Sequence, residues 1–130
     1  MVNKPTKGVE ALVDEAAAQV ESLSVAAARA EVSEGAVLVD LRDVRELKHE
    51  GRIPGAIHAP RGMIEFWIDP DSPYHREALT TPDRLILFCS LGWRSALAAK
   101  SLQDMGITGV AHLEGGFKAW MEEGEPIDET

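Results

Sequence analysis

Short apolar runs separated by helical patterns predict an α/β fold. Three runs of strand length are almost continuously apolar: Ala36–Leu41, Leu85–Phe88 and Val110–Leu113. Runs of this kind, without alternation of polar and apolar positions, are typical of strands buried on both faces of a parallel sheet. Apolar positions at helical spacing, as in Val9–Val20, predict helices that cover such a sheet. The pattern therefore predicts a small parallel-stranded sheet flanked by helices.

Three polar side chains are placed to begin helices. Ser24 and Asp43 stand directly before helical patterns at 25–32 and 44–49, and Ser95 stands at the start of a third. Side-chain oxygens of serine and aspartate accept hydrogen bonds from the free amides of a first helical turn. We therefore expect all three residues to be N-caps.

The length of 130 residues suits one domain with one core. Residues 1–21 are expected to form an N-terminal arm and helix, which ends where Ser22–Ser24 breaks the pattern. Residues 22–124 are expected to form the domain. Residues 125–130 are expected to form an acidic tail that frays.

The connection Arg61–Asp83 is long and rich in aromatic side chains. A connection of this length in a small domain is often a lid or a binding loop. An aromatic helix face that completes the core is the alternative, and the sequence leaves both interpretations open.

Composition limits the partners and the location. A net charge of −9 argues against nucleic acid and anionic membrane surfaces. No apolar run approaches the length of a membrane span, and no apolar signal core follows Lys4 and Lys7. The single cysteine cannot form an internal disulfide, so it only permits a reducing location. We expect the cytoplasm, which would keep Cys89 available. No residues have convincing metal-ligand spacing, and we expect neither a metal nor a cofactor.

The candidate chemistry lies where the run Leu85–Phe88 meets a helical pattern. Cys89 follows the run, and Gly92 and Arg94 come directly after it. A loop that opens a helix presents unpaired amides, and the helix dipole adds about half a positive charge there. Gly92 can adopt a positive φ that turns amides inward, and Arg94 adds a planar donor fork. Cys89 therefore lies where a thiolate would be stabilised; a core cysteine beside a surface arginine is the less favoured alternative.

Cys89–Ser95, with the pattern Cys-x-x-Gly-x-Arg-Ser, resembles the active-site loop of the rhodanese family of sulfurtransferases. Asp40–Ala59 resembles a second family motif, although Arg52 replaces its usual histidine. Leu113–Trp120 resembles the closing Leu-x-Gly-Gly-x-x-x-Trp motif. Four residues separate Cys89 from Arg94, whereas related dual-specificity phosphatases of the same fold have a loop one residue longer. The resemblance implies the rhodanese-like fold, a small parallel sheet with helices on both faces.

The resemblance also implies roles for single residues. Cys89 and Arg94 would be catalytic. The loop amides and the mouth of the site would bind substrate through Ser90, Leu91, Gly92, Trp93 and Ser95. Asp40 and Arg42 stand at the carboxyl end of the run Ala36–Leu41, where functional groups of a parallel sheet gather, and we expect them to support the loop through an ion pair rather than to form a surface pair. In the family, the region of Glu65 and Trp67 lies beside the active-site loop, so these two supporting residues would line its mouth.

The implied function is transfer of sulfane sulfur from thiosulfate or a persulfide to a thiol or cyanide, through a persulfide on Cys89. Uncharged Leu91 and bulky Trp93 favour an organic persulfide, or a protein donor such as a cysteine desulfurase, over the thiosulfate dianion. One alternative is a non-catalytic sulfur carrier or interaction module. Another is a phosphatase or arsenate reductase that uses the same cysteine, against which the shorter loop argues.

Overall fold

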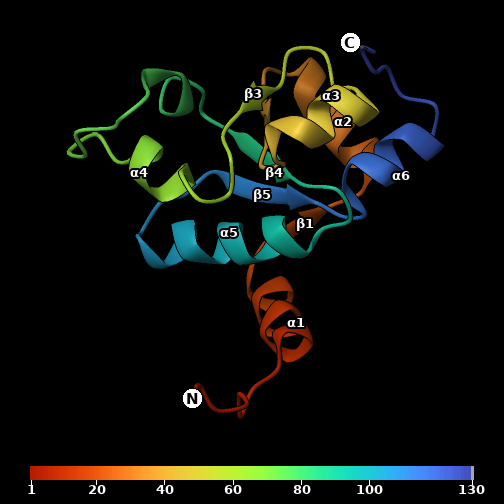
Figure 1. Ribbon diagram of the computed structural model, residues 1–130. Helices are drawn as coiled ribbons and strands as arrows, with labels where there is room; N and C mark the ends of the chain where they lie inside the picture. Colours follow the sequence, from red (N-terminus) through yellow and green to blue (C-terminus); the bar gives the residue numbers. More distant parts are fainter. Residues whose placement is uncertain (130) are drawn as a thin grey trace.

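Residues 1–129 form a single parallel sheet of five strands in the order β1-β5-β4-β2-β3 (Figure 1). The structure is a computed structural model that describes residues 1–129. The strands are β1 Glu21–Leu23, β2 Val37–Asp40, β3 Ile57–His58, β4 Leu85–Phe88 and β5 Val110–Leu113. The helices are α1 Val9–Gln19, α2 Val25–Ser33, α3 Val44–Glu50, α4 Ile64–Ile68, the 3-10 turn η1 Glu77–Leu79, α5 Trp93–Asp104 and α6 Gly116–Glu122.

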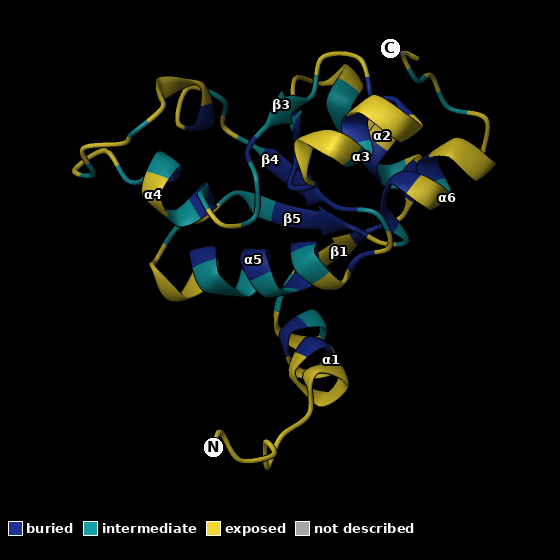
Figure 2. Ribbon diagram, in the orientation of Figure 1, coloured by how far each residue is buried: buried dark blue, intermediate teal, exposed yellow. Residues whose placement is uncertain are grey.

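Helices cover both faces of the sheet, as the sequence predicts (Figure 1). α2, α3 and α6 lie on one face, whereas α4 and α5 lie on the other and α1 packs against α5. One apolar cluster joins the sheet to α2 and α6 and includes Phe117 and Trp120. A second joins the sheet to α4 and α5 and includes Ile64 and Leu102. Central β4 contributes alternate residues to the two clusters, and all four are buried (Figure 2): Leu85, Ile86, Leu87 and Phe88.

Two of the three expected N-caps are confirmed. The Ser24 hydroxyl accepts a hydrogen bond from the Ala27 amide at 3.1 Å. Asp43 forms a reciprocal capping box with Glu46. The expectation for Ser95 is wrong, because α5 begins earlier, after Gly92 at φ +120°, and Ser95 lies fully buried in its first turn. A glycine in this conformation ends the loop without a side-chain cap.

The edge strand β1 was not expected, because three residues carry too little pattern to identify a strand. The expectation that the C-terminal tail frays is also wrong as far as Asp128. Arg52 and Asp128 exchange backbone hydrogen bonds of 2.9 and 2.7 Å, and the Trp120 indole donates to the Pro126 carbonyl at 2.8 Å. Thr130 lies outside the described residues.

The connection 61–83 contributes to the core. Ile64 and Ile68 of α4 are buried beside α5, and Leu79 of η1 is buried in the same cluster. The connection therefore contributes a helix to the core, as in the second interpretation, but the face that completes the core is aliphatic rather than the expected aromatic one, since Phe66 of the same helix is exposed.

Within residues 1–129, no helix is both long enough and apolar enough to cross a membrane. The same residues contain no group of three or more histidine, cysteine or acidic side chains placed to hold a metal ion.

We predict that Arg42→Ala costs about 3–5 kcal/mol of unfolding free energy, because it leaves the buried Asp40 carboxylate without its partner. Arg42 is fully buried, and its guanidinium contacts Asp40 at 2.8 Å, the Gly51 carbonyl at 2.9 Å and the Phe117 ring at 4.0 Å. Urea denaturation measures the loss. The double variant Asp40→Leu/Arg42→Met should be more stable than Arg42→Ala, since it buries no lone charge. An unfolding free energy of Arg42→Ala within about 1 kcal/mol of the native value would contradict this prediction.

Candidate active site

The candidate site lies where the carboxyl ends of three neighbouring strands meet. Cys89 follows β4, Leu41 and Arg42 follow β2, and His112 lies near the end of β5. Parallel strands end at the same edge of the sheet, so side chains placed there converge. The structure thus brings residues from three separate parts of the chain to one end of the sheet.

The loop that follows Cys89 supplies backbone donors. The Gly92 amide donates to the Cys89 sulfur at 3.1 Å, and the positive φ of Gly92 allows this turn. The amides of Trp93, Arg94 and Ser95 form the first turn of α5, and within residues 1–129 they have no protein acceptor. These amides and the dipole of the twelve-residue helix give the loop a positive potential without a metal ion.

The Cys89 thiol lies below the surface. Cys89 is 1% exposed, and its sulfur lies 3.7 Å from the Ser95 hydroxyl. Leu91 and Trp93, by contrast, are 61% and 51% exposed, so the apolar side chains of the loop face solvent. We call Leu91 and Trp93, the two exposed apolar side chains of this loop, its apolar rim.

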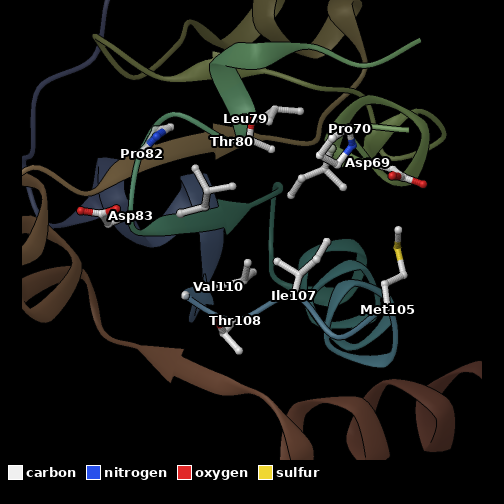
Figure 3. A pocket seen from close by; sticks show the side chains of 13 residues that line it. Asp69, Pro70, Leu79, Thr80, Pro82, Asp83, Met105, Ile107, Thr108 and Val110 are labelled. Atoms are coloured by element: carbon white, nitrogen blue, oxygen red, sulfur yellow. The ribbon is translucent and has the colours of Figure 1, made fainter. Parts of the chain in front are cut away.

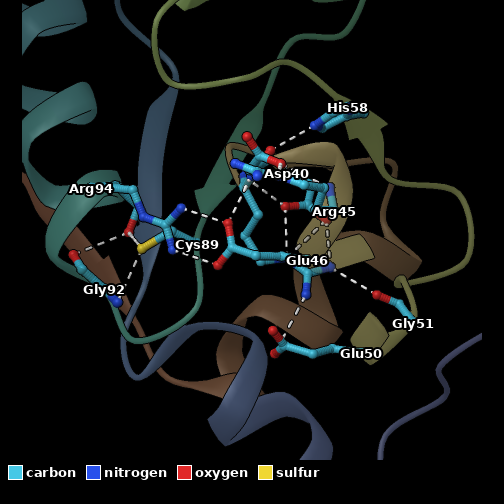
Figure 4. A network of polar contacts seen from close by, with 12 residues as sticks. Asp40, Arg45, Glu46, Glu50, Gly51, His58, Cys89, Gly92 and Arg94 are labelled. Atoms are coloured by element: carbon cyan, nitrogen blue, oxygen red, sulfur yellow. Dashed lines mark hydrogen bonds and ion pairs between the residues drawn. The ribbon is translucent and has the colours of Figure 1, made fainter. Parts of the chain in front are cut away.

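Arg94 is engaged by a carboxylate from another element. Its guanidinium donates to both Glu46 carboxylate oxygens, at 2.8 and 3.0 Å, which ties the loop to α3 (Figure 4). Arg94 holds the pKa of Glu46 below its ordinary value, although burial opposes this. Glu46 in turn raises the pKa of Arg94, and the nearby Cys89 adds to that effect. Much of the donor fork that the sequence offers to an incoming anion is thus already used.

Asp40 and Arg42 form the ion pair that the sequence predicts, and both are buried. Their effect on the loop is indirect. The pair holds the end of β2, from which α3 starts, and α3 presents Glu46 to Arg94. His58 supports the same turn through a 2.7 Å contact between its ring and the Arg42 carbonyl.

The closing glycine pair fixes the outer side of the loop. The Phe117 amide donates to the Cys89 carbonyl at 2.8 Å, and the Lys118 amide donates to the Ser90 carbonyl at 3.1 Å. Gly116 has φ +60°, and a Cβ there would lie 2.5 Å from the Cys89 carbonyl oxygen. Gly116 therefore allows a close backbone approach, and the residue that this approach holds is the candidate nucleophile.

A buried histidine that sequence reasoning missed joins the site. One ring nitrogen of His112 lies 3.1 Å from the Ser95 hydroxyl, and the other lies 2.9 Å from the Ser22 hydroxyl. Burial lowers the pKa of His112, with partial opposition from Glu114. The feature that could have identified His112 is its position near the carboxyl end of a predicted strand, because such ends gather at one side of a parallel sheet.

Two expected supporting residues lie elsewhere. Glu65 accepts a hydrogen bond from Ser101, in the second half of α5, at 2.7 Å. The Trp67 ring packs against the second apolar cluster and under the Arg76 guanidinium, 4.1 Å from the ring centroid. α4 therefore lies beside the far end of α5, and the structure does not bring these residues together with the Cys89 loop (Figure 1).

A pocket of about 430 Å³ lies at the amino ends of β4 and β5 (Figure 3). Its lining includes Leu85 and Val110, which begin β4 and β5, together with Met105 after α5. Cys89 lies at the other ends of these elements, so the pocket is separate from the candidate site.

Comparisons with known proteins agree with this geometry. A family model described as a rhodanese-like domain matches residues 24–123. A mouse thiosulfate sulfurtransferase/rhodanese-like domain-containing protein 3 is 29% identical over 94 residues, which cover 68% of this chain and 60% of that protein. This chain thus spans less than two thirds of that curated relative.

Two solved structures are also similar. The polysulfide-sulfur transferase homodimer of Wolinella succinogenes is 31% identical, with a TM-score of 0.71 over 93% of this chain and 87% of that chain. A Rhodopseudomonas palustris protein, described as of unknown function and a possible tyrosine phosphatase, is 45% identical, with a TM-score of 0.91 over 98% of this chain and 99% of that chain.

We predict that Gly116→Ala destabilises the protein by at least about 2 kcal/mol, since an alanine adds left-handed strain to a clash with backbone. The matched control is Gly124→Ala, at φ +76° with no atom within 4 Å of the added Cβ. Gly124→Ala should lower the unfolding free energy only by the cost of the left-handed backbone conformation, about 1–2 kcal/mol. Thermal unfolding compares the two, and equal losses would contradict the close approach at Gly116.

We predict that Glu46→Gln lowers stability at neutral pH by about 0.5–1 kcal/mol, because the pair with Arg94 is partly exposed. The pKa of Glu46 is depressed in the folded state, so its contribution is present above the ordinary glutamate range and declines as pH falls below about 4.5. Urea denaturation from neutral to acidic pH should therefore show the native and variant curves converging in acid. A gap that stays constant would contradict this assignment.

Proposed function

Because the chain belongs to the rhodanese-like domain family, we propose that it moves sulfane sulfur from a donor to a thiophilic acceptor through a persulfide on Cys89. The observation that carries this proposal is the backbone around the thiol. One amide donates to the sulfur at 3.1 Å, and the three first-turn amides of α5 have no acceptor within residues 1–129. Free amides at the start of a helix, directly after an amide that already donates to the sulfur, suit a sulfur that carries negative charge.

The reaction has two half-steps. The Cys89 thiolate attacks the outer sulfur of the donor, a new S–S bond forms, and the remainder of the donor leaves with the electron pair of the broken bond. A nucleophilic acceptor, such as cyanide or a thiol, then takes the outer sulfur and releases the Cys89 thiolate. The amides and the helix dipole stabilise the charged sulfur in both steps without reorganising.

The surroundings of the thiol favour an organic persulfide, or a protein donor such as a cysteine desulfurase, over thiosulfate. Exposed Leu91 and Trp93 give an apolar rim, and Glu46 already occupies the fork of Arg94. The net charge of −9 adds a weak long-range repulsion of a dianion. We propose that thiosulfate is a slower donor, and that the protein works in a reducing compartment such as the cytoplasm, which keeps the thiol available.

A second candidate function is phosphate chemistry at the same cysteine, and its support is the similar Rhodopseudomonas palustris protein described as a possible tyrosine phosphatase. Two features argue against it. The loop has four residues between Cys89 and Arg94, one fewer than the related phosphatases. A phosphate dianion would also have to compete with the Glu46 carboxylate for Arg94.

We predict that incubation with a sulfane donor adds the mass of one sulfur atom to the intact protein, that cyanide removes it, and that Cys89→Ser never acquires it. Glutathione persulfide and thiosulfate serve as donors, and the persulfide should load faster. A native protein that gains no sulfur from either donor would refute the proposal.

Hydrolysis of an aryl phosphate without any sulfur gain would establish the second candidate instead. A non-catalytic interaction module is the remaining alternative. It would be supported if Cys89→Ser fully retained the biological role of the protein.

A further inference from the structure

We propose that His112 is a positioning residue that relays the proton of the Cys89 thiol, acting through the Ser95 hydroxyl, and that this route reaches the surface at Ser22. The inference deepens the proposed function and rests on it, because it concerns how the thiol loses its proton before attack and regains it afterwards.

Three contacts connect the thiol to the surface. The Cys89 sulfur lies 3.7 Å from the Ser95 oxygen, within reach of a hydrogen bond to sulfur. The Ser95 oxygen lies 3.1 Å from Nδ1 of His112. Nε2 of His112 lies 2.9 Å from the Ser22 oxygen.

The fold explains why these groups meet. β5 lies between β1 and β4, and its register pairs His112 with Ser22 on one side and with Leu87 on the other. Cys89, Ser95 and His112 are all at most 4% exposed, whereas Ser22 is exposed. A buried thiol therefore has a hydrogen-bonded route to solvent that does not cross the apolar rim of the loop.

The donors and acceptors of the thiol, Ser95 and His112 match those that a proton relay needs. A neutral imidazole has one donor and one acceptor nitrogen, and a hydroxyl both donates and accepts. When Nε2 donates to Ser22, Nδ1 can accept from Ser95, and the Ser95 oxygen can accept from the thiol. Each hydrogen bond then points away from Cys89. The Ser95 hydroxyl also lies 3.2 Å from the Gly92 carbonyl, which provides its alternative acceptor.

The transfer balances without an added reactant. The thiol proton passes to the Ser95 oxygen, the former hydroxyl proton passes to Nδ1, and the Nε2 proton leaves through Ser22 to water. His112 ends neutral, with its proton on the other nitrogen, and the Cys89 thiolate attacks the donor sulfur. The reverse sequence returns a proton when the acceptor has taken the sulfur.

Burial of His112 supports a neutral relay. Desolvation lowers its pKa, although Glu114, the charged residue that acts on it, partly opposes the shift. Its other polar neighbours are the uncharged Ser22 and Ser95 hydroxyls. A neutral ring keeps the lone pair that the relay requires.

The test compares His112→Asn with the native protein from mildly acidic to neutral pH. The asparagine amide can still donate to Ser95, but it cannot exchange a proton between two nitrogens. Two rates are measured: alkylation of Cys89 by iodoacetamide, and single-turnover loading of sulfur from glutathione persulfide. His49→Asn, an exposed histidine on α3, is the matched control.

Because the relay is the route by which the buried thiol loses its proton, deprotonation limits both reactions at high reagent concentration. His112→Asn should then slow both by at least about tenfold, which is less than a positioned proton-transfer group typically contributes. The half-saturating concentration of the persulfide should stay within about twofold, because donor binding is unchanged. The control should keep native rates. Native rates in a folded His112→Asn protein would overturn the relay, as would a loss of rate together with weakened donor binding and a lower melting temperature, which mark a structural role.

The rate of alkylation by iodoacetamide tests the relay independently of the proposed function, because it requires no sulfur transfer. If the native protein gains no sulfur but its alkylation still depends on His112, the sulfurtransferase proposal fails and the relay stands. If the native protein gains sulfur and alkylation is independent of His112, only the relay fails.

Discussion

The hydrogen bond from the Gly92 amide to the buried Cys89 sulfur is the interaction on which the rest of the site depends. A sulfur at the end of a fully buried strand has little access to water, so any negative charge on it must be stabilised by the protein. The loop provides this stabilisation with backbone groups, which do not titrate and need no side-chain rearrangement. The cost is a backbone path that only a glycine at φ +120° follows easily.

Neighbouring elements hold that path from both sides. On one side, Glu46 of α3 binds Arg94, and the buried Asp40–Arg42 pair fixes the turn from which α3 begins. On the other, the start of α6 donates two amides to the loop carbonyls, where Gly116 leaves no room for a Cβ. The same contacts that stabilise the fold therefore aim the loop, which explains why motifs far apart in the sequence meet around one cysteine.

The sequence was sufficient to predict the parallel α/β class, the Cys89 loop and the Asp40–Arg42 pair, because each follows from local pattern or from the rule that parallel strands end at one edge. Ser95 was wrongly expected to cap α5, since the backbone of Gly92 starts the helix instead. The contact between Ser95 and His112 depends on strand order, which a single sequence does not specify. Glu65 and Trp67 were misplaced for a similar reason, because the packing of α4 against α5 is set by tertiary contacts.

A crystal structure of the protein after loading with a sulfane donor tests the central claim most directly. The account predicts a second sulfur bonded to Cys89 inside the loop, within hydrogen-bond distance of the first-turn amides of α5, while Arg94 stays on Glu46. An outer sulfur that points past Trp93 into solvent, or first-turn amides that bond to other protein groups instead, would contradict it.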